Sequence, residues 1–410
     1  MLRVAPARRW VVLALACALG AAGSAAWAQP LPLRRPPDPQ GLEGPRRAPL
    51  TLTPTLTVEW EFNDNVVLNN DDKREDFITR FTPGISLEWE SPIYRLAAAY
   101  SFSAELHAKE THLSRAFDAH RFALDTLYRI DPQLTLTLTD TFAFDTDTNL
   151  IAPEGVATGR DQAYGNTLAA GATWTMTPLT KLHGTSSWSI QRFDREDLFD
   201  SDVYRAELIL ERTLTTRLTG SVGYEFGYFD IQREENVTTH TPRIGVTYRF
   251  TETLTGTLRA GPAIQIEEDN DTRVTPAVTA NLLQRRAWGA IGVDYNRSIG
   301  VAGGLGGPTD NQSVGVLVQL TTLTKGLTVE LAPRYFTTET PDDRIDVRSF
   351  TLPLTAIYRV NAWLAVVGAY NFLHQRSDSR VTVVGAALAN DVDQNRISVG
   401  VQVGYPIRFD

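Results

Sequence analysis

Apolar and polar side chains alternate along most of the chain, and the segment 241–261 shows the pattern most clearly. Its first half has an apolar or aromatic side chain at every second position: Ile244, Val246, Tyr248 and Phe250. After a short polar turn near Glu252 the alternation resumes, and Arg243, Arg249 and Arg259 all fall on the polar side. A period of two is typical of a two-faced β-strand. The segment therefore predicts a β-hairpin with one apolar and one polar face.

The length of the alternating segments separates a membrane barrel from a soluble sandwich. Strands of soluble proteins usually have about 5 to 6 residues, whereas a strand that crosses a membrane needs about 9 to 11. The segments here reach the longer range. A slip of one residue would move the arginines to the apolar face, at about 2 to 4 kcal/mol each in mid-membrane. The pattern thus favours a membrane β-barrel with a well-specified register.

About 18 such segments can be counted, an even number, as expected for a bacterial barrel with both termini in the periplasm. We expect strands at 54–62, 77–90, 93–108, 118–130, 134–146, 164–177, 181–193, 202–213, 217–229, 237–250, 254–267, 272–285, 288–299, 312–321, 326–339, 346–360, 363–375 and 394–409. Short connections such as 91–92 alternate with long polar ones such as 147–163 and 376–393, as periplasmic turns alternate with external loops. The predicted fold is all-β, a transmembrane antiparallel up-and-down β-barrel formed by residues 54–410.

The ends of the chain indicate where the barrel is inserted. Arginines, an apolar core at 10–20 and the sequence Ala26-Trp27-Ala28 predict a Sec signal peptide at 1–28. Residues 29–53 are rich in proline and arginine and predict an extended periplasmic leader. At the other end, Phe409 in the last strand looks like the signal by which barrel assembly machinery recognises its substrates, although Asp410 follows it. We therefore expect the chain in the outer membrane of a Gram-negative cell.

Composition excludes other classes of protein. The chain has 410 residues and a formal charge of -9, and no apolar run after the first 30 residues approaches the roughly 18 needed for a spanning helix. The single cysteine, Cys17, lies in the predicted signal peptide, so the mature chain forms no disulfide. The acidic charge argues against nucleic acid as a partner. Aromatic residues on the apolar parity, many near strand ends, predict contact with outer-membrane lipids and lipopolysaccharide.

Two segments carry a resemblance to a known family. Residues 61–66, EFNDNV, follow the first expected strand, and residues 77–84, FITRFTPG, open the second. Together with the pairs Tyr248-Arg249 and Tyr358-Arg359, they make the chain similar to a family of outer-membrane β-barrel porins associated with exopolysaccharide production systems. The resemblance implies a barrel in the outer membrane, with polysaccharide or export-system proteins as partners. It implies no catalytic residues.

Residues 111–120, THLSRAFDAH, are the densest candidate for chemistry because they contain serine, histidine and acid. A catalytic triad is defined by geometry, so a polar external loop is the interpretation we adopt, and we expect no enzyme. Acidic clusters such as 267–271 lack the spacing of a calcium-binding EF-hand loop, and the six histidines lack zinc-ligand spacing. We expect no metal and no cofactor.

The functional surface that the pattern predicts is the lumen. Candidate pore-lining residues share the polar parity: Arg80, Arg121, Arg205, Arg243, Arg249, Arg259, Arg334, Arg359, Glu88, Glu207, Glu225 and Glu330. A mixed, slightly basic wall suits a hydrated pore with a mild preference for anions or sugars. Asp140 and Arg192 break the pattern, and either a β-bulge or a position at the rim would accommodate them.

Two functions fit this wall. The first is a porin-like channel for passive passage of small hydrophilic solutes or polysaccharide, because barrels of 16 to 18 strands leave an aqueous channel unless it is plugged. The alternative is a non-conducting structural or accessory barrel of an envelope or exopolysaccharide assembly. Inward folding of the 147–163 or 376–393 loop would narrow the bore.

Overall fold

The computed structural model describes residues 50–147, 156–267, 271–301, 303–321, 323–340, 344–378, 382–383, 386–387 and 391–409. The predicted signal peptide and most of the predicted leader lie outside these residues. The first strand begins at Leu50, whereas the sequence pattern placed the end of the leader at residue 53. Residues 50–53 alternate threonine with leucine and pair with the neighbouring strands, which extends the barrel beyond the expected boundary.

Long antiparallel strands make up nearly all of the described chain. Their bounds are β1 Leu50–Asn63, β2 Asp76–Glu90, β3 Tyr94–His107, β4 Arg115–Arg129, β5 Leu134–Asp147, β6 Arg160–Thr177, β7 Thr180–Phe193, β8 Ser201–Thr213, β9 Leu218–Ile231, β10 Val237–Arg249, β11 Leu254–Glu267, β12 Thr272–Arg286, β13 Gly289–Val301, β14 Pro308–Leu320, β15 Leu327–Leu331, β16 Arg334–Glu339, β17 Asp346–Arg359, β18 Leu364–Ser377, β19 Thr382–Val383, β20 Ala386–Ala387, β21 Val392–Gly404 and β22 Ile407–Phe409. A short 3-10 helix, η2, spans Thr111–Leu113. No helix in the described ranges is long and apolar enough to cross a membrane.

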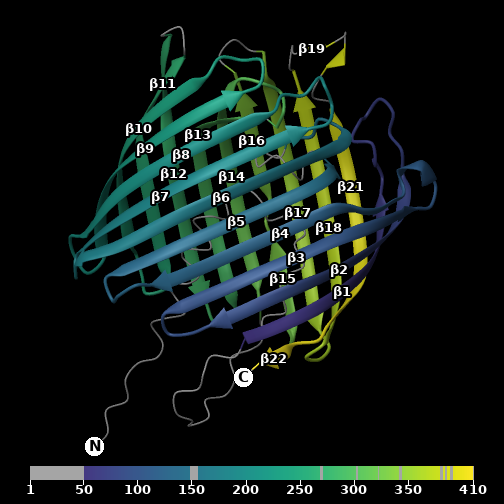
Figure 1. Cartoon of the computed structure of the whole chain (residues 1–410), viewed down its shortest axis with the longest axis horizontal. Helices are drawn as coiled ribbons and strands as arrows, with labels where there is room; N and C mark the ends of the chain where they lie inside the picture. The colour runs from purple at the N-terminus through teal and green to yellow at the C-terminus, as the bar shows by residue number, and fades with distance from the viewer. Residues whose placement is uncertain are drawn as a thin grey trace, which may run out of the picture.

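The sheet closes on itself. Each barrel strand pairs with the next barrel strand along the chain, and β1 also pairs with β21 and β22 at the other end of the chain. β19 and β20 form a separate two-stranded sheet, so β18 pairs directly with β21. β15 and β16 lie end to end between β14 and β17, and β21 and β22 both pair with β1. Counting each of these as one interrupted strand gives a closed barrel of 18 antiparallel strands, which confirms the predicted fold (Figure 1).

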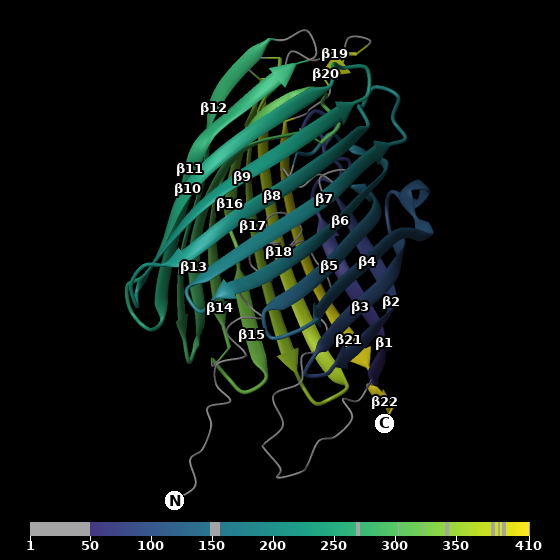
Figure 2. The same cartoon turned by 60° about the vertical axis from the view of Figure 1, so that its left-hand side comes forward.

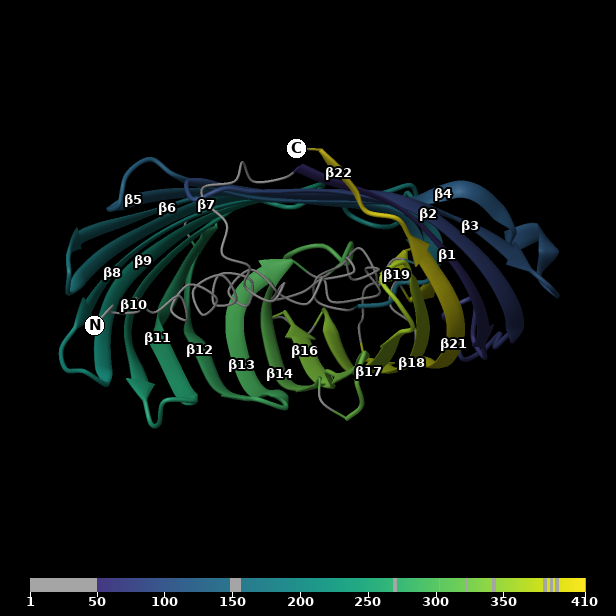
Figure 3. The same cartoon turned by 90° about the horizontal axis from the view of Figure 1, so that it is seen from below.

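The two ends of the barrel differ. The strands are strongly tilted, and the start of β1 and β22 both lie at the end where neighbouring strands are joined by short turns (Figure 2). We call this the short-turn end and the opposite end, which carries β19, β20 and η2, the long-loop end. Seen along its axis the ring is flattened, with β5–β7 in one broad wall and β14–β17 in the other (Figure 3).

The side-chain alternation follows the closed ring. In the β1–β2 ladder, Glu59 is opposite Arg80 and Trp60 is opposite Thr79. Trp60 is 53% exposed on the outside, whereas Glu61 on the other parity is 4% exposed. Outward leucine, valine and aromatic side chains continue this apolar outer surface around the barrel. This is the arrangement of a transmembrane barrel, in which apolar groups face lipid and polar groups face the lumen.

Candidate functional site

The inner wall of β1, β2 and β3 carries a network of ion pairs centred on Arg80. Its guanidinium lies 2.8 Å from Glu105, 3.1 Å from Glu61 and 3.3 Å from Glu59. These carboxylates come from both neighbouring strands, which the register brings beside Arg80. Arg160, at the start of β6, contacts the same Glu105 at 3.0 Å. Side chains from non-adjacent strands can meet in this way only on the inside of the ring.

A second network crosses the inner face of β8 to β11. Glu225 lies 3.2 Å from Arg205 and 3.3 Å from Arg243, and Arg243 also lies 3.5 Å from Glu207. In the next row Arg259 contacts Glu211 at 2.9 Å. Acidic and basic groups therefore alternate across the wall, so most of the charge is neutralised locally while the polar groups remain available to water.

Further pairs continue the polar inner wall. Arg121 contacts Asp145 at 3.0 Å, Arg334 contacts Asp294 at 2.8 Å, and Glu330 accepts a hydrogen bond from Gln319 at 3.3 Å. The structure thus brings nine of the predicted residues into polar contacts on the inward parity: Arg80, Arg121, Arg205, Arg243, Arg259, Arg334, Glu207, Glu225 and Glu330.

The other three predicted residues lie apart from these networks. Arg249, Arg359 and Glu88 are at strand ends near the short turns. No ion pair involves them in the part of the chain that the structure describes. They fit a vestibule at the short-turn end better than a narrow part of the bore, and a pore-lining role for the whole set stays a prediction.

Loops fold into the barrel at the long-loop end. Val156, Leu198, Leu305, Ile345 and Val347 form a buried apolar cluster, which we call the mouth cluster, with Phe193 and Phe199 packed against it. Four loops contribute to this cluster, together with the first residues of β17. Its apolar burial holds the loops together, so the mouth has a packed core of its own.

Hydrogen bonds connect these loops to opposite walls of the ring. Ala157, which follows β5, donates from its N–H to Gln375 of β18 and accepts from the same amide, both at 2.8 Å. Both residues are fully buried. Residues 156–159 belong to the 147–163 loop whose inward folding would narrow the bore, and they bridge the lumen here. The 376–393 loop is described only in part.

One glycine allows the close packing of the mouth cluster. Gly304 has a φ of +87°, and a Cβ at this position would lie 3.0 Å from Phe193 and 3.1 Å from Leu198. The N–H of Phe199 also donates to the carbonyl of Gly304 at 2.9 Å. A larger residue would be strained in its backbone and would clash with the cluster.

A second apolar cluster lines the inside of β8 to β13. It consists of Val203, Phe229, Ile231, Val237, Ala263, Ala277, Ile299 and Val301, which we call the inner cluster. The Arg205 guanidinium lies over the Phe229 ring at 5.1 Å and donates a hydrogen bond to the carbonyl oxygen of Ile299 at 2.7 Å. Apolar side chains therefore cover the inner wall of the long-loop half at this narrow side of the flattened ring.

The serine, histidine and acid of residues 111–120 do not assemble into a triad. The Ser114 hydroxyl accepts from the backbone N–H of His107, and the His112 ring lies 3.5 Å from Glu110. His120 faces outward and contacts Tyr100. Among the residues that the structure describes, no three His, Cys, Asp or Glu side chains converge as metal ligands.

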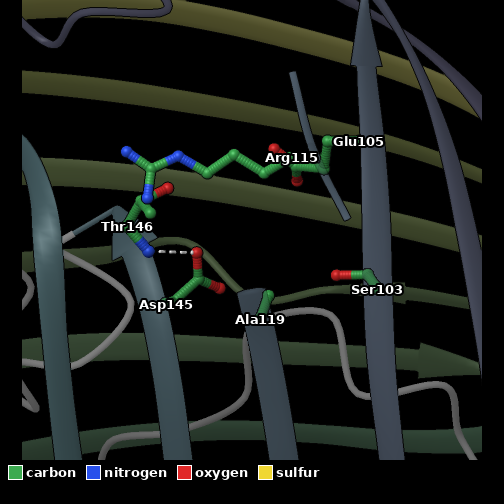
Figure 4. A pocket seen from close by; sticks show the side chains of 6 residues that line it. All are labelled: Ser103, Glu105, Arg115, Ala119, Asp145 and Thr146. Carbon is green, nitrogen blue, oxygen red and sulfur yellow. Dashed lines mark hydrogen bonds between the residues drawn. The ribbon is translucent and has the colours of Figure 1, made fainter. Parts of the chain in front are cut away.

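A small polar hollow lies beside the β3–β4 bulge, between Glu105, Arg115 and Asp145 (Figure 4). Its volume is only 10 Å³, about the size of one water molecule. The Asp145 carboxylate in it accepts from the backbone N–H of Thr146 at 2.7 Å. The hollow is too small for an organic substrate.

The structure also places the two residues that break the alternation. Arg192 lies near the end of β7 and pairs with Asp202, which accepts a hydrogen bond from Trp188 at 3.0 Å. It is therefore a rim residue. Asp140 lies in mid-strand with an unbroken register, so neither a bulge nor a rim position explains it. It accepts from the Asn166 amide at 2.7 Å on the outer face.

Sequence reasoning missed several contributors to this site. The sequence pattern predicts a polar connection at 147–163, whereas Arg160 is the first residue of β6. The mouth cluster and the inner cluster depend on contacts between distant segments, which periodicity does not report. The prolines of β10 to β12 were the available signal for an irregular wall, since proline is rare inside sheets.

No protein-family model and no curated protein sequence matches the chain. Solved structures with a similar architecture include OccAB4 of Acinetobacter baumannii, with 12% identity, 89% of this chain and 100% of that chain covered, and a TM-score of 0.44. OccK8 (OprE) of Pseudomonas aeruginosa is 13% identical in sequence. The alignment covers 87% of this chain and 98% of that chain, with a TM-score of 0.46. OpdK of Pseudomonas aeruginosa, solved with vanillate, is 11% identical in sequence. The alignment covers 87% of this chain and 99% of that chain, and the TM-score is again 0.46. At this level of similarity they carry no argument about the function of this chain.

Proposed function

We propose that the chain is a narrow outer-membrane channel for passive passage of small hydrophilic solutes. The observation that carries the proposal is the ion-paired inner wall of a closed 18-strand ring, in which Arg80, Arg243 and their carboxylate partners face inward. Fixed charges in pairs bind water and polar solutes without holding any one of them tightly. Such a channel needs no catalytic residue and no cofactor.

The mouth cluster limits what passes. Loops that bridge the lumen, such as Ala157 to Gln375, leave less room than an open ring of this size would. We therefore expect a small conductance and exclusion of large polymers. The link to exopolysaccharide stays a prediction based on the short segments 61–66 and 77–84, and the packed mouth argues for a solute smaller than a polysaccharide.

The same mouth cluster favours a second candidate, a structural or accessory barrel that conducts little. In either case the outer belt of exposed aromatic and aliphatic side chains would contact outer-membrane lipids and lipopolysaccharide. Barrel assembly machinery and export-system proteins remain expected partners, and the Sec signal peptide remains an expected feature of residues 1–28.

Single-channel recording of the purified, folded barrel in a planar bilayer separates the two candidates. A channel gives discrete conductance steps that grow when the mouth cluster is loosened, for example by Gly304→Val. An accessory barrel gives no steps, either as the wild type or as this variant. Resistance to SDS at room temperature and its loss on heating would show that both proteins are folded.

A further inference from the structure

The hydrogen-bond ladder between β12 and β13 stops partway along the strands. It runs from the Arg286–Gly289 pair to the Val278–Arg297 pair and ends there. Residues 272–277 of β12 still pair with β11, and the end of β13 still pairs with β14. The end of β13 bends toward the inside of the ring, where its arrowhead lies in Figure 3. The wall therefore has a gap in its long-loop half.

A row of prolines explains where the ladder fails. Pro262 lies directly opposite Pro276 in the β11–β12 ladder, and the β10–β11 register lacks pairs at the level of Pro242 and Pro262. Because neither proline has an N–H, Pro262 and Pro276 form a non-hydrogen-bonded pair, and the nitrogen of Pro276 faces β13. β12 thus lacks a donor where β13 would need one. Prolines are tolerated in sheets at such edges.

Side chains from other strands donate hydrogen bonds to the backbone carbonyls of β13 that have no ladder partner at the gap. In a regular ladder the carbonyls of Ile299 and Val301 would face β12. Here the Ile299 carbonyl accepts from Arg205 of β8 at 2.7 Å, and the Val301 carbonyl accepts from the Asn311 amide at 3.5 Å. Both residues also pack in the inner cluster beside Ala277. The inward position of β13 is therefore stabilised by its own contacts.

The edge of β12 is left free. By the same alternation, the N–H of Val274 and the carbonyls of Val274 and Pro276 face the gap, and no partner for them is found within the described ranges. Val274 is the third residue of β12, near the long-loop end, and its unpaired backbone groups need water or another polar group as a partner. The preceding residue, Arg273, is exposed and forms no ion pair with any described residue.

Apolar surfaces lie on both sides of this polar edge. On the outer face, a hollow of 430 Å³ is lined mainly by Ala260, Pro262, Val274, Pro276 and Val278. The hollow is shallow and open along the outer face. On the inner face lies the inner cluster, whereas the rest of the wall near Arg243 and Arg80 is ionic. A polar edge beside an apolar hollow is complementary to an amphiphile.

We propose that the gap between β12 and β13 is a lateral portal that binds a long-chain carboxylic acid. The acyl chain lies in the outer hollow, and the carboxylate enters the gap, where it accepts hydrogen bonds from the Val274 N–H and from Arg273, which is on the inward parity of β12 together with Ala277. A free acid suits the site for two reasons. The unpaired groups include a backbone donor and a cation, which both bind a carboxylate. Only β11 and β12 line the hollow, which suits a single acyl chain. The portal connects the membrane with the lumen and does not depend on axial conduction.

Photolabelling tests the ligand. The full-length mature barrel in lipid nanodiscs is irradiated with a diazirine derivative of palmitic acid, and labelled peptides are mapped by mass spectrometry. We expect the label to concentrate in residues 260–278. Ala260→Trp, which fills the hollow, should abolish this enrichment, whereas Val222→Trp on the outer face of β9 should leave it unchanged. Label spread evenly around the outer belt would overturn the proposal.

The carboxylate is tested separately. Arg273→Gln should weaken palmitate binding by about tenfold, the effect of losing one charge-assisted hydrogen bond, and should leave methyl palmitate unaffected. Equal weakening of both probes would contradict carboxylate recognition. A diazirine phosphatidylethanolamine that labels 260–278 as efficiently as the palmitate probe would show that the hollow holds membrane lipid only.

Cysteine pairs test the gap itself, since the only cysteine, Cys17, lies in the predicted signal peptide. Thr279 and Asn296 are opposite each other in the ladder, so Thr279→Cys with Asn296→Cys should form a disulfide under mild oxidation. Thr275 and Gly300 would be opposite if the ladder continued. Thr275→Cys with Gly300→Cys should remain reduced, and ready formation of that disulfide would mean that the wall is closed.

Discussion

Glu61 of β1 accepts two hydrogen bonds from Arg396 of β21, from Nε and from Nη2, each at 3.0 Å. This two-point contact joins the first and last strands of the ring, and Arg80 lies 3.1 Å from the same carboxylate. Paired contacts of this kind are among the strongest polar interactions in proteins. The closure of the barrel is thus supported by a buried ion pair as well as by the β1–β21 ladder.

Glu61→Ala should therefore destabilise the barrel by about 3 to 5 kcal/mol, because it leaves two arginines without their shared buried partner. The free energy of unfolding, measured by urea titration in lipid vesicles, checks this. Glu88→Ala is the matched control, since Glu88 is exposed and its loss should change stability by less than about 0.5 kcal/mol. Equal effects of the two variants would contradict a special role for the closure.

Loosening the mouth cluster should change conductance more than barrel stability. Leu198 is 2% exposed in this cluster, and Leu198→Ala should cost about 2 to 5 kcal/mol of local packing. The loss falls on loops and not on the ladder, so we expect larger conductance steps with an unchanged melting temperature of the barrel. Leu208→Ala on the outer face, where Leu208 is 53% exposed, should leave the steps as they are. Unchanged steps in Leu198→Ala would mean that the cluster does not restrict the bore.

The strands and their faces were predictable because alternation is a local property. The expected strand 254–267 has the observed bounds, and the inward parity of Arg80, Arg243 and Arg259 follows from the same pattern. The mouth was not predictable, since the contact between Ala157 and Gln375 joins residues far apart in the sequence. The gap beside Pro276 had a local signal, but a proline alone does not say which ladder is lost.

Acid should loosen the mouth only below the ordinary pKa of an aspartate. Arg195 donates hydrogen bonds to Asp197 in the loop between β7 and β8 and thereby lowers the pKa of that carboxyl below 3.8. A depressed pKa stabilises the folded loop fully above pH 3.8, and this contribution is lost as the pH falls through the lowered value. Arg195 also donates to the carbonyl of Thr158 in the mouth.

Conductance should thus stay constant from about pH 8 to about pH 5 and rise only in stronger acid. Asp197→Asn should already conduct more at neutral pH and lose the acid response, because it cannot hold Arg195 by charge. A step near pH 6 to 7 in the wild type would assign the response to a histidine instead.

Arg243 should set the charge preference of the channel that we propose. It lies 3.3 Å from Glu225 and 3.5 Å from Glu207, so Arg243→Gln removes the positive charge beside both carboxylates, of which only Glu225 also contacts Arg205. The reversal potential in a KCl gradient should shift toward cation selectivity. Arg243→Lys keeps the charge and should shift it little. A change of the same size in both variants would indicate an altered bore and not an altered charge.

The outward pair of Asp140 and Asn166 should reduce the stability of the barrel. Polar groups on the lipid face are unfavourable, and an acid there costs less than the roughly 2 to 4 kcal/mol of an arginine or lysine. Asp140→Leu with Asn166→Leu should therefore raise the free energy of unfolding in lipid vesicles by about 1 to 2 kcal/mol. Asn166→Leu alone should lower it, because the carboxylate then loses the amide donor at 2.7 Å. A double variant that is less stable than the wild type would mean that the pair has a partner on the outside of the barrel.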